Sequence, residues 1–276
     1  TGACNVAFGC GALLANTTAS YNVSIGLQSS LSNTTGTQNV VAGSFALQSN
    51  TTGNCNTTIG HSSGYAGTTA SCNVSIGNRS LCKITTGSSN VAVGLQSLFS
   101  NTTASNNTAV GSSALCLNTT GGLNVATGAY SLASNTTGAD NTASGGYAMK
   151  ENTTGTGNVG VGRSALRCNT TADANTAVGN SALCLNTTGG GNAAFGSEAL
   201  KSNTGSNNTA IGFCSLIANT TASNNTALGS KSLDTNTTGS CNTGIGRNAL
   251  FSNTTASTNT AIGYDALFAN TTGCKN

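Results

Sequence analysis

A 17-residue pattern fills almost the whole chain, and no other feature of the sequence constrains its fold as strongly. The pattern reads N-T/V-A-V/I-G-x-x-A-L-x-x-N-T-T-G/A-x-x, and its clearest copy spans Asn107–Leu123. A short repeat of fixed length stacks each copy on the next, so such a chain forms a solenoid rather than a globular domain. We number the positions of each copy from 1, the first Asn, to 17.

Sixteen copies follow one another without a linker, which predicts a single continuous repeat array over residues 1–276. One copy, at 192–207, is shorter by a single residue. The copies begin at Asn5, Asn22, Asn39, Asn56, Asn73, Asn90, Asn107, Asn124, Asn141, Asn158, Asn175, Asn192, Asn208, Asn225, Asn242 and Asn259.

Composition excludes several classes of protein. Only 5% of the residues are charged and 4% are aromatic, and the formal net charge is +3. The nine Lys and Arg residues are scattered over seven of the sixteen copies, so there is no basic stripe for nucleic acid. Few rings are present to stack on bases. No apolar segment approaches the ~20 residues of a membrane-spanning helix. We therefore expect no nucleic-acid partner and no membrane insertion.

Each copy has the chemistry of a β-coil with two short strands and two bends. N-T-A-V-G is β-prone, x-A-L-x is the predicted second strand, and N-T-T-G carries turn residues. Gly at position 5, present in every copy, allows a bend with positive φ. A helix is disfavoured because Gly, Asn and Thr are poor helix formers. The sequence therefore predicts an all-β fold, a parallel β-solenoid or β-roll of about sixteen 17-residue coils.

Equal positions of successive copies should stack into columns, and these columns predict the interior. Position 4 is usually Ile, Val, Leu or Phe and position 9 is usually Leu, so we expect these two columns to form a dry core. Position 1 is Asn in all sixteen copies. We expect its amides to hydrogen-bond along the stack as an asparagine ladder.

The segments N-T-A-V-G at Asn175–Gly179 and N-T-A-I-G at Asn259–Gly263 resemble the head repeats of trimeric autotransporter adhesins. The whole pattern, N-T-A-V-G-x-x-A-L-x-x-N-T-T-G, is similar to repeat arrays in tail-fibre-like proteins of phages and giant viruses. The resemblance covers residues 5–275, and it implies a parallel β-roll in a protein of a cell or virion surface.

The N-T-T triplet at positions 12–14 has two main interpretations. As a sequon it predicts N-glycosylation in thirteen copies. The candidate acceptors are Asn16, Asn33, Asn50, Asn101, Asn118, Asn135, Asn152, Asn169, Asn186, Asn219, Asn236, Asn253 and Asn270. As structure it predicts a threonine ladder, because both threonines remain where Gly67 and Ile84 replace the Asn. Glycans on every coil would also be attached only ~4.8 Å apart.

Ice binding is a third and less favoured interpretation of the threonines. Flat threonine arrays on solenoids bind ice, and the low charge fits such a protein. Ice-binding faces present T-x-T on one strand, whereas these threonines are adjacent and lie in a predicted turn. Adjacent strand residues would point to opposite faces.

Eleven cysteines in a chain of such low charge favour an oxidising location. The disulfide candidates are Cys55 with Cys72 at position 17 of successive copies, Cys4 with Cys10, and Cys168 with Cys184. Cys4 and Cys274 are candidates for a bond between subunits. The sequence has no C-x-x-C and a single His, so we expect no metal site.

No catalytic constellation is recognisable, because the six acidic residues never share a column in successive copies. We expect no enzyme activity, no catalytic residue and no cofactor. The favoured function is a structural subunit of an extracellular fibre or surface appendage of a cell or virion. Its partners would be copies of itself, stacked head-to-tail and in lateral contact, with an N-glycan coat. The alternative is the shaft or head segment of a surface adhesin or viral tail fibre.

Overall fold

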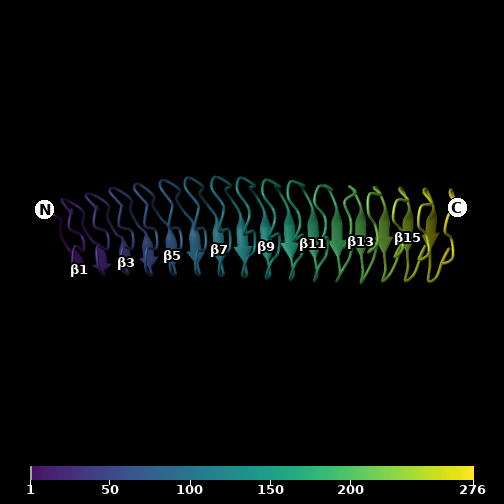
Figure 1. The fold of residues 1–276 in the computed structure, drawn as a ribbon, viewed down its shortest axis with the longest axis horizontal. Helices are drawn as coiled ribbons and strands as arrows, with labels where there is room; N and C mark the ends of the chain where they lie inside the picture. Colours follow the sequence, from purple (N-terminus) through teal and green to yellow (C-terminus); the bar gives the residue numbers. More distant parts are fainter. Residues whose placement is uncertain (1) are drawn as a thin grey trace. The chain divides into compact units, whose positions relative to one another are not determined.

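A computed structural model describes residues 2–276, which form strands and turns but no helix. The chain divides into two compact units, Thr1–Asp140 and Asn141–Asn276, each of which contains eight parallel strands (Figure 1). Each unit is a parallel β-solenoid with one strand in every coil, which confirms the predicted fold class. The single continuous array over residues 1–276 stays a prediction.

The strands are short and equally spaced along the sequence. Those of the first unit are β1 (Val6–Phe8), β2 (Val23–Ile25), β3 (Val40–Ala42), β4 (Thr57–Ile59), β5 (Val74–Ile76), β6 (Val91–Val93), β7 (Thr108–Val110) and β8 (Val125–Thr127). Those of the second unit are β9 (Thr142–Ser144), β10 (Val159–Val161), β11 (Thr176–Val178), β12 (Ala193–Phe195), β13 (Thr209–Ile211), β14 (Thr226–Leu228), β15 (Thr243–Ile245) and β16 (Thr260–Ile262).

Within each unit, neighbouring strands pair in parallel and in register, so that equal positions of successive coils lie side by side. Val6 pairs with Val23 in the first unit, and Thr226 pairs with Thr243 in the second. The 16-residue coil keeps this register, since Ala193 still pairs with Thr209. Its missing residue is position 14, which lies in a turn, so the deletion leaves the strand ladder unchanged.

The prediction that position 4 lies in the core is wrong, because position 3 points inward and position 4 outward. In β13, Ala210 is 0% exposed whereas Ile211 is 40% exposed. Successive residues of a strand point to opposite faces, so only the middle residue of each strand faces inward. It packs with the small residue at position 8 and the Leu at position 9, such as Leu216, which is 0% exposed.

The narrow interior sets the size of the side chain at position 3, which is usually Ala or Ser. Larger and smaller residues compensate for one another across the core. Gly64 replaces the usual Leu at position 9 beside Thr58, where an added Cβ would lie 3.2 Å from the threonine methyl. Gly160 replaces the usual Ala at position 3 beside Met149, where an added Cβ would lie 3.2 Å from the methionine Cγ. In these two places a small residue accommodates a larger neighbour across the core.

The predicted second strand at x-A-L-x is also wrong, since these residues form turns with left-handed backbone at positions 7 and 9. In one coil, Ser164 has φ 59° and Leu166 has φ 51°. The N–H of Ser164 donates to Gly146 O of the preceding coil at 3.0 Å, and that of Leu166 donates to Ala182 O of the following coil at 2.9 Å. Hydrogen bonds to both neighbours offset the cost of these left-handed residues.

Glycine at position 5 makes the predicted bend with positive φ, which all sixteen copies confirm. Gly111 has φ 138°, and a Cβ added there would lie 2.6 Å from Gly128 O in the next coil. Both the backbone conformation and the approach of the next coil therefore require glycine.

Candidate functional site

Among residues 2–276 the structure shows no pocket and no group of three His, Cys, Asp or Glu side chains that could hold a metal ion. No helix in this part of the chain is long and apolar enough to cross a membrane. The candidate functional features are therefore columns of side chains, which run along each unit. Some columns lie inside the coils, and others face solvent.

Position 1 forms the predicted asparagine ladder inside the coils. Asn107 donates its backbone N–H to Asn90 Oδ1 at 3.0 Å, and its Oδ1 accepts the N–H of Asn124 at 2.9 Å. Its Nδ2 donates across the coil to Gly121 O, at position 15, at 2.9 Å. Each buried amide thus joins three successive coils and also closes its own.

Position 12 forms a second asparagine ladder, which the sequence analysis did not predict. Asn118 Nδ2 donates to Asn101 Oδ1 of the preceding coil at 3.1 Å and to Gly121 O of its own coil at 2.9 Å. The Asn side chains at positions 1 and 12 therefore converge on one carbonyl oxygen. A carbonyl has two lone pairs, so this oxygen can accept both hydrogen bonds.

This second ladder decides how the sequons can be used. Eleven of the thirteen candidate acceptors are at most 1% exposed: Asn33, Asn50, Asn101, Asn118, Asn135, Asn152, Asn169, Asn186, Asn219, Asn236 and Asn253. The other two, Asn16 and Asn270, are half-buried in terminal coils and donate to Ala19 O and Gly273 O. A glycan is a bulky group that must reach solvent. The eleven buried amides therefore cannot carry N-glycans while the chain has this fold.

The first threonine of the triplet forms the predicted threonine ladder. Thr51 Oγ1 donates to Thr68 O of the next coil at 3.1 Å, and Thr68 Oγ1 donates to Thr85 O at 3.2 Å. The ladder therefore continues through the coils that lack Asn at position 12. The second threonine, as in Thr69 and Thr86, is exposed and lies in a turn.

All eleven cysteines are free thiols, so the predicted disulfides of Cys55 with Cys72, Cys4 with Cys10, and Cys168 with Cys184 are absent. Cys168 and Cys184 do lie in neighbouring coils, where the N–H of Cys168 donates to Cys184 O at 3.0 Å. Burial raises the pKa of Cys184 and Cys214, which keeps both as neutral thiols at neutral pH.

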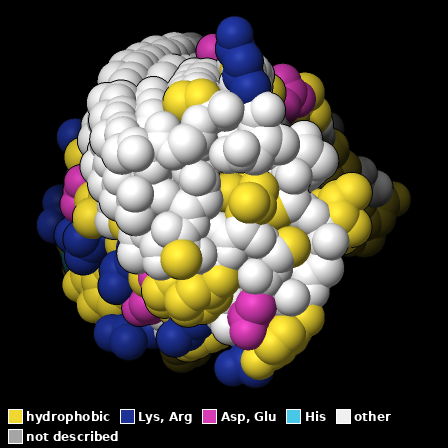
Figure 2. Space-filling view, turned by 90° about the vertical axis from the view of Figure 1, so that its right-hand side faces the viewer, with side chains coloured by type: hydrophobic (Ala, Val, Ile, Leu, Met, Phe, Trp, Pro, Cys, Tyr) yellow, Lys and Arg dark blue, Asp and Glu magenta, His cyan; other side chains and the backbone are white. Residues whose placement is uncertain are grey.

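Charged side chains are confined to a few columns. All nine Lys and Arg and all six Asp and Glu residues occupy positions 6, 7, 10, 11, 16 or 17. Figure 2 shows them gathered over parts of the surface, beside a broad band that carries none. Positions 6, 7, 10 and 11, which we call the variable face, also change residue type from coil to coil. A contact that distinguishes one coil from another can therefore use this face.

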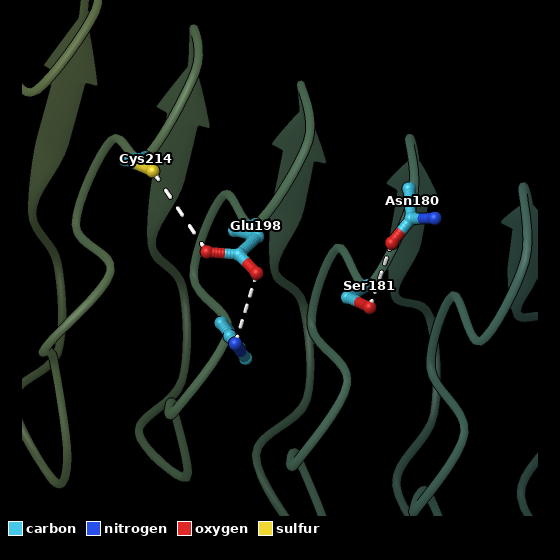
Figure 3. A network of polar contacts seen from close by, with 5 residues as sticks. Asn180, Ser181, Glu198 and Cys214 are labelled. Atoms are coloured by element: carbon cyan, nitrogen blue, oxygen red, sulfur yellow. Dashed lines mark hydrogen bonds and ion pairs between the residues drawn. The ribbon is translucent and has the colours of Figure 1, made fainter.

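One polar network of the variable face joins two neighbouring coils (Figure 3). Glu198 accepts a hydrogen bond from Lys201 Nζ at 2.9 Å, and Cys214 Sγ donates to its other carboxylate oxygen at 3.9 Å. The hydrogen bond to Glu198 raises the pKa of Lys201. The network therefore links Lys201 and Glu198 of one coil to Cys214 of the next.

Rings and cations elsewhere on the variable face also contact one another from coil to coil. The guanidinium of Arg79 lies 4.9 Å from the ring centre of Phe99, and the rings of Phe251 and Phe268 stack with centres 5.0 Å apart. Such contacts stabilise neighbouring coils and still leave ring surface exposed.

The outward side chains at positions 2 and 4 of the strands form a separate surface, which we call the sheet face. Position 2 is Val or Thr in all coils but one, and position 4 is mostly aliphatic. Val110 is 40% exposed and Leu228 is 44% exposed. Sequence analysis missed this face because it placed position 4 in the core.

No protein-family model and no curated protein matches the chain. The fold and its columns are thus the basis for any functional inference. The resemblance to adhesin heads and tail fibres has no support beyond the repeat architecture itself.

Proposed function

We propose that the chain is a structural subunit of an extracellular fibre, which grows as copies stack head-to-tail. The observation that carries this proposal is the complementarity of the two sides of every coil. In the coil after Asn158, the N–H groups of Val159 and Leu166 donate to the following coil, and those of Gly162 and Ser164 donate to the preceding coil. A coil of another copy offers the same donors and acceptors at the same positions.

The core of a coil also needs a neighbour on each side. Leu250, which is covered by coils on both sides, is 0% exposed, whereas its counterpart Leu267 in the last full coil is 38% exposed. Stacking another coil on Leu267 would bury this side chain and pair the open edge of β16. Fully burying an exposed leucine contributes about 1.5–3 kcal/mol. Leu267 is only 38% exposed, so stacking would add roughly a third of this amount, and the paired strand adds to it.

The second candidate is the shaft or head of a surface adhesin or viral tail fibre. Its specific support is the variable face, where residue type changes from coil to coil while the inward columns stay constant. A receptor could use exposed rings there, such as Tyr65 and Tyr130, which are 40% and 41% exposed. Binding of the purified chain to cells or glycans would favour this candidate, whereas filaments without such binding favour the fibre.

Stacking is tested by comparing the unmodified chain with a Leu267→Asp variant. We expect the unmodified chain to form filaments whose mean length grows with concentration, and the variant to stay short because it buries a charge at the junction. Length is measured by electron microscopy and by sedimentation velocity. A chain that sediments as a monomer at every concentration would overturn the proposal.

Leu117→Asp is the matched control, because Leu117 is also exposed, at 49%, but lies on the variable face of an inner coil. We expect this variant to form filaments as long as those of the unmodified chain. Equal shortening in both variants would mean that any added charge blocks assembly, and end-to-end stacking would then be rejected as the cause.

Cys4 and Cys274 give a second test of the same junction. Both thiols are exposed, at positions 17 and 16 of coils near opposite ends of the sequence. Head-to-tail stacking would bring them close, so dioxygen with a copper catalyst should link two chains by removing two electrons and two protons. Covalent dimers on a non-reducing gel, lost in Cys274→Ser, are the expected result.

A further inference from the structure

The sheet face is apolar although it is exposed. In β13 the side chain of Thr209 is half-buried and that of Ile211 is 40% exposed, while Ala210 between them is 0% exposed. The same outward–inward–outward pattern recurs from β2 to β16. Side chains at positions 2 and 4 therefore form two parallel rows on the outside of each unit.

The composition of these rows is as constant as that of a core column. Position 4 is Val, Ile, Leu or Phe in thirteen of sixteen coils, and no charged residue occurs at position 2 or 4 in any coil. The other exposed columns behave differently, since positions 6, 7, 10 and 11 carry charged, polar, apolar and aromatic residues in turn. An exposed column that stays apolar is typical of a surface that another molecule covers.

Strand propensity alone does not explain this constancy. Thr has a high β-propensity, as Val and Ile do, and it is compatible with solvent. Position 2 uses Thr in eight coils, whereas position 4 uses it only once, at Thr127. The two positions lie on the same strand and the same face, so the scarcity of Thr at position 4 reflects what contacts that row.

A second copy of this chain fits the sheet face better than an unrelated partner. Its rows have the same spacing between strands, so side chains of two facing copies can interdigitate over many coils, as in packed β-sheets. The face has no charge that would select a partner of opposite sign. A self-complementary contact of this kind is two-fold symmetric.

The area of the sheet face can be compared with the area that stable protein interfaces bury. Eight strands ~4.8 Å apart and three residues long span on the order of 40 Å by 10 Å, or roughly 400 Å² for each unit. Contact over the face of one unit would bury about half of the ~800 Å² that stable protein interfaces bury on each partner, and contact over the faces of both units would reach that size.

We propose that the sheet face is a lateral dimerisation surface, through which two copies of the chain pack face to face. The pairing goes beyond the proposed end-to-end stacking and does not depend on it. Stacking sets the length of an assembly, whereas lateral pairing sets its width and its mass per unit length.

The test is a double variant, Ile59→Lys with Ile211→Lys, which places one charge on the sheet face of each unit. Both side chains are 40% exposed, so the coils should fold as before, which circular dichroism and the melting temperature would check. Each substitution occurs twice in a two-fold contact. We therefore expect the pairs to dissociate at least about a hundredfold more readily.

The readouts are the molar mass from light scattering and the mass per unit length of any filament from electron microscopy. The unmodified chain should show paired copies, and the double variant should show half the mass per unit length with filament length unchanged. The double variant Ile59→Thr with Ile211→Thr keeps β-branched residues and should weaken pairing less. It keeps the test decisive if the lysines disturb folding.

The matched control is Ile217→Lys, which changes the same residue type in the same coil but on the variable face. We expect this variant to pair like the unmodified chain. Single copies in the unmodified chain, or pairs that survive in the double variant, would overturn the lateral surface. Loss of pairing in the control as well would overturn it too, because the effect would then be unspecific. None of these results bears on filament length.

Discussion

Two stretches of the first unit differ in a single inward column. The coil that begins at Asn107 contains two asparagine ladders, at positions 1 and 12, whereas the coils that begin at Asn56 and Asn73 contain only the first. Their position 12 is Gly67 and Ile84. Strand pairing and the threonine ladder continue through both stretches. A coil can therefore lose one ladder and keep its form.

The carbonyl at position 15 explains why the second ladder is dispensable. Gly121 O accepts from both Asn107 and Asn118, at 2.9 Å each. Gly87 O, in a coil with one ladder, accepts from Asn73 alone at 3.0 Å. In both cases the Asn at position 1 donates its Nδ2–H to this carbonyl oxygen. Its Oδ1 also accepts the backbone N–H of the Asn that begins the next coil. The first ladder is thus essential, and the second shares one of its tasks.

The largest loss of stability is expected in Gly111→Ala, which would push two neighbouring coils apart and so break both ladders between them. Its Cβ would lie 2.6 Å from Gly128 O, and alanine disfavours φ 138°, so neighbouring coils must separate. We expect a loss of at least about 4 kcal/mol in the free energy of unfolding, measured with urea. Gly157→Ala is the control, because no atom lies within 4 Å of its added Cβ. The control should cost about 1–2 kcal/mol, and equal losses would contradict the steric argument.

The next largest loss of stability is expected from breaking the first ladder, and it should be larger in a coil that lacks the second ladder. In Asn73→Ala, Gly87 O loses its donor and the N–H of Asn90 loses its acceptor at 2.9 Å. In Asn107→Ala, Gly121 O keeps Asn118, and only one backbone group is left unbonded. At about 1–3 kcal/mol for each buried unsatisfied group, Asn73→Ala should cost twice as much. Urea midpoints of the two variants decide this, and equal midpoints would mean that the second ladder gives no compensation.

A smaller effect is expected from the second ladder itself, in Asn118→Ala. Gly121 O keeps Asn107, and Asn135 Nδ2, which loses Asn118 Oδ1 at 2.8 Å, keeps Gly138 O at 2.9 Å. Asn101 Oδ1 also loses its donor, Asn118 Nδ2 at 3.1 Å. No backbone group is left unbonded, so we expect a loss of about 1–2 kcal/mol from the two amide–amide hydrogen bonds. A loss larger than that of Asn107→Ala would reverse the ranking of the two ladders.

The sequence predicted the repeat, the coil, the bend at position 5 and the first ladder, because each depends on a residue type with one local role. Of the two apolar columns that it placed in the core, position 9 is buried, as Leu216 shows, whereas position 4 faces outward. The rule that large apolar side chains lie inside fails here, since the interior beside each strand accommodates only a small residue such as Ala210, while Ile211 faces outward. Left-handed leucines such as Leu166 are also unpredictable, because leucine has no local preference for that conformation.

The second ladder did leave a signal in the sequence, which the sequon pattern obscured. An Asn that carries a glycan must be exposed. If the column at position 12 were exposed, polar residues of any size could replace its Asn. The replacements in this column are Gly67 and Ile84, and Ile84 is 2% exposed. An isoleucine in place of an asparagine indicates a buried position, whose amide must then be hydrogen-bonded within the coil.

The smallest effect should come from a charged group that belongs to neither ladder. Burial raises the pKa of Asp234 above its ordinary value of 3.8, and the nearby charge of Lys231 lowers it less. The folded chain then binds this proton more tightly than the unfolded chain. Its contribution to stability is therefore present below the unfolded pKa and is lost as the pH rises through the folded pKa.

Asp234→Asn removes this titration, so the unmodified chain should lose stability relative to the variant as the pH rises above 3.8. Urea midpoints of both proteins over the acidic range measure the difference. A relative gain for the unmodified chain would contradict the assignment, because it would mean that the folded state favours the carboxylate. A pH effect as large as the stability loss in Asn118→Ala would show that the variable face contributes as much to coil stacking as the second ladder. The size of a residue's contribution to stability would then depend on its burial and not on whether it belongs to a ladder.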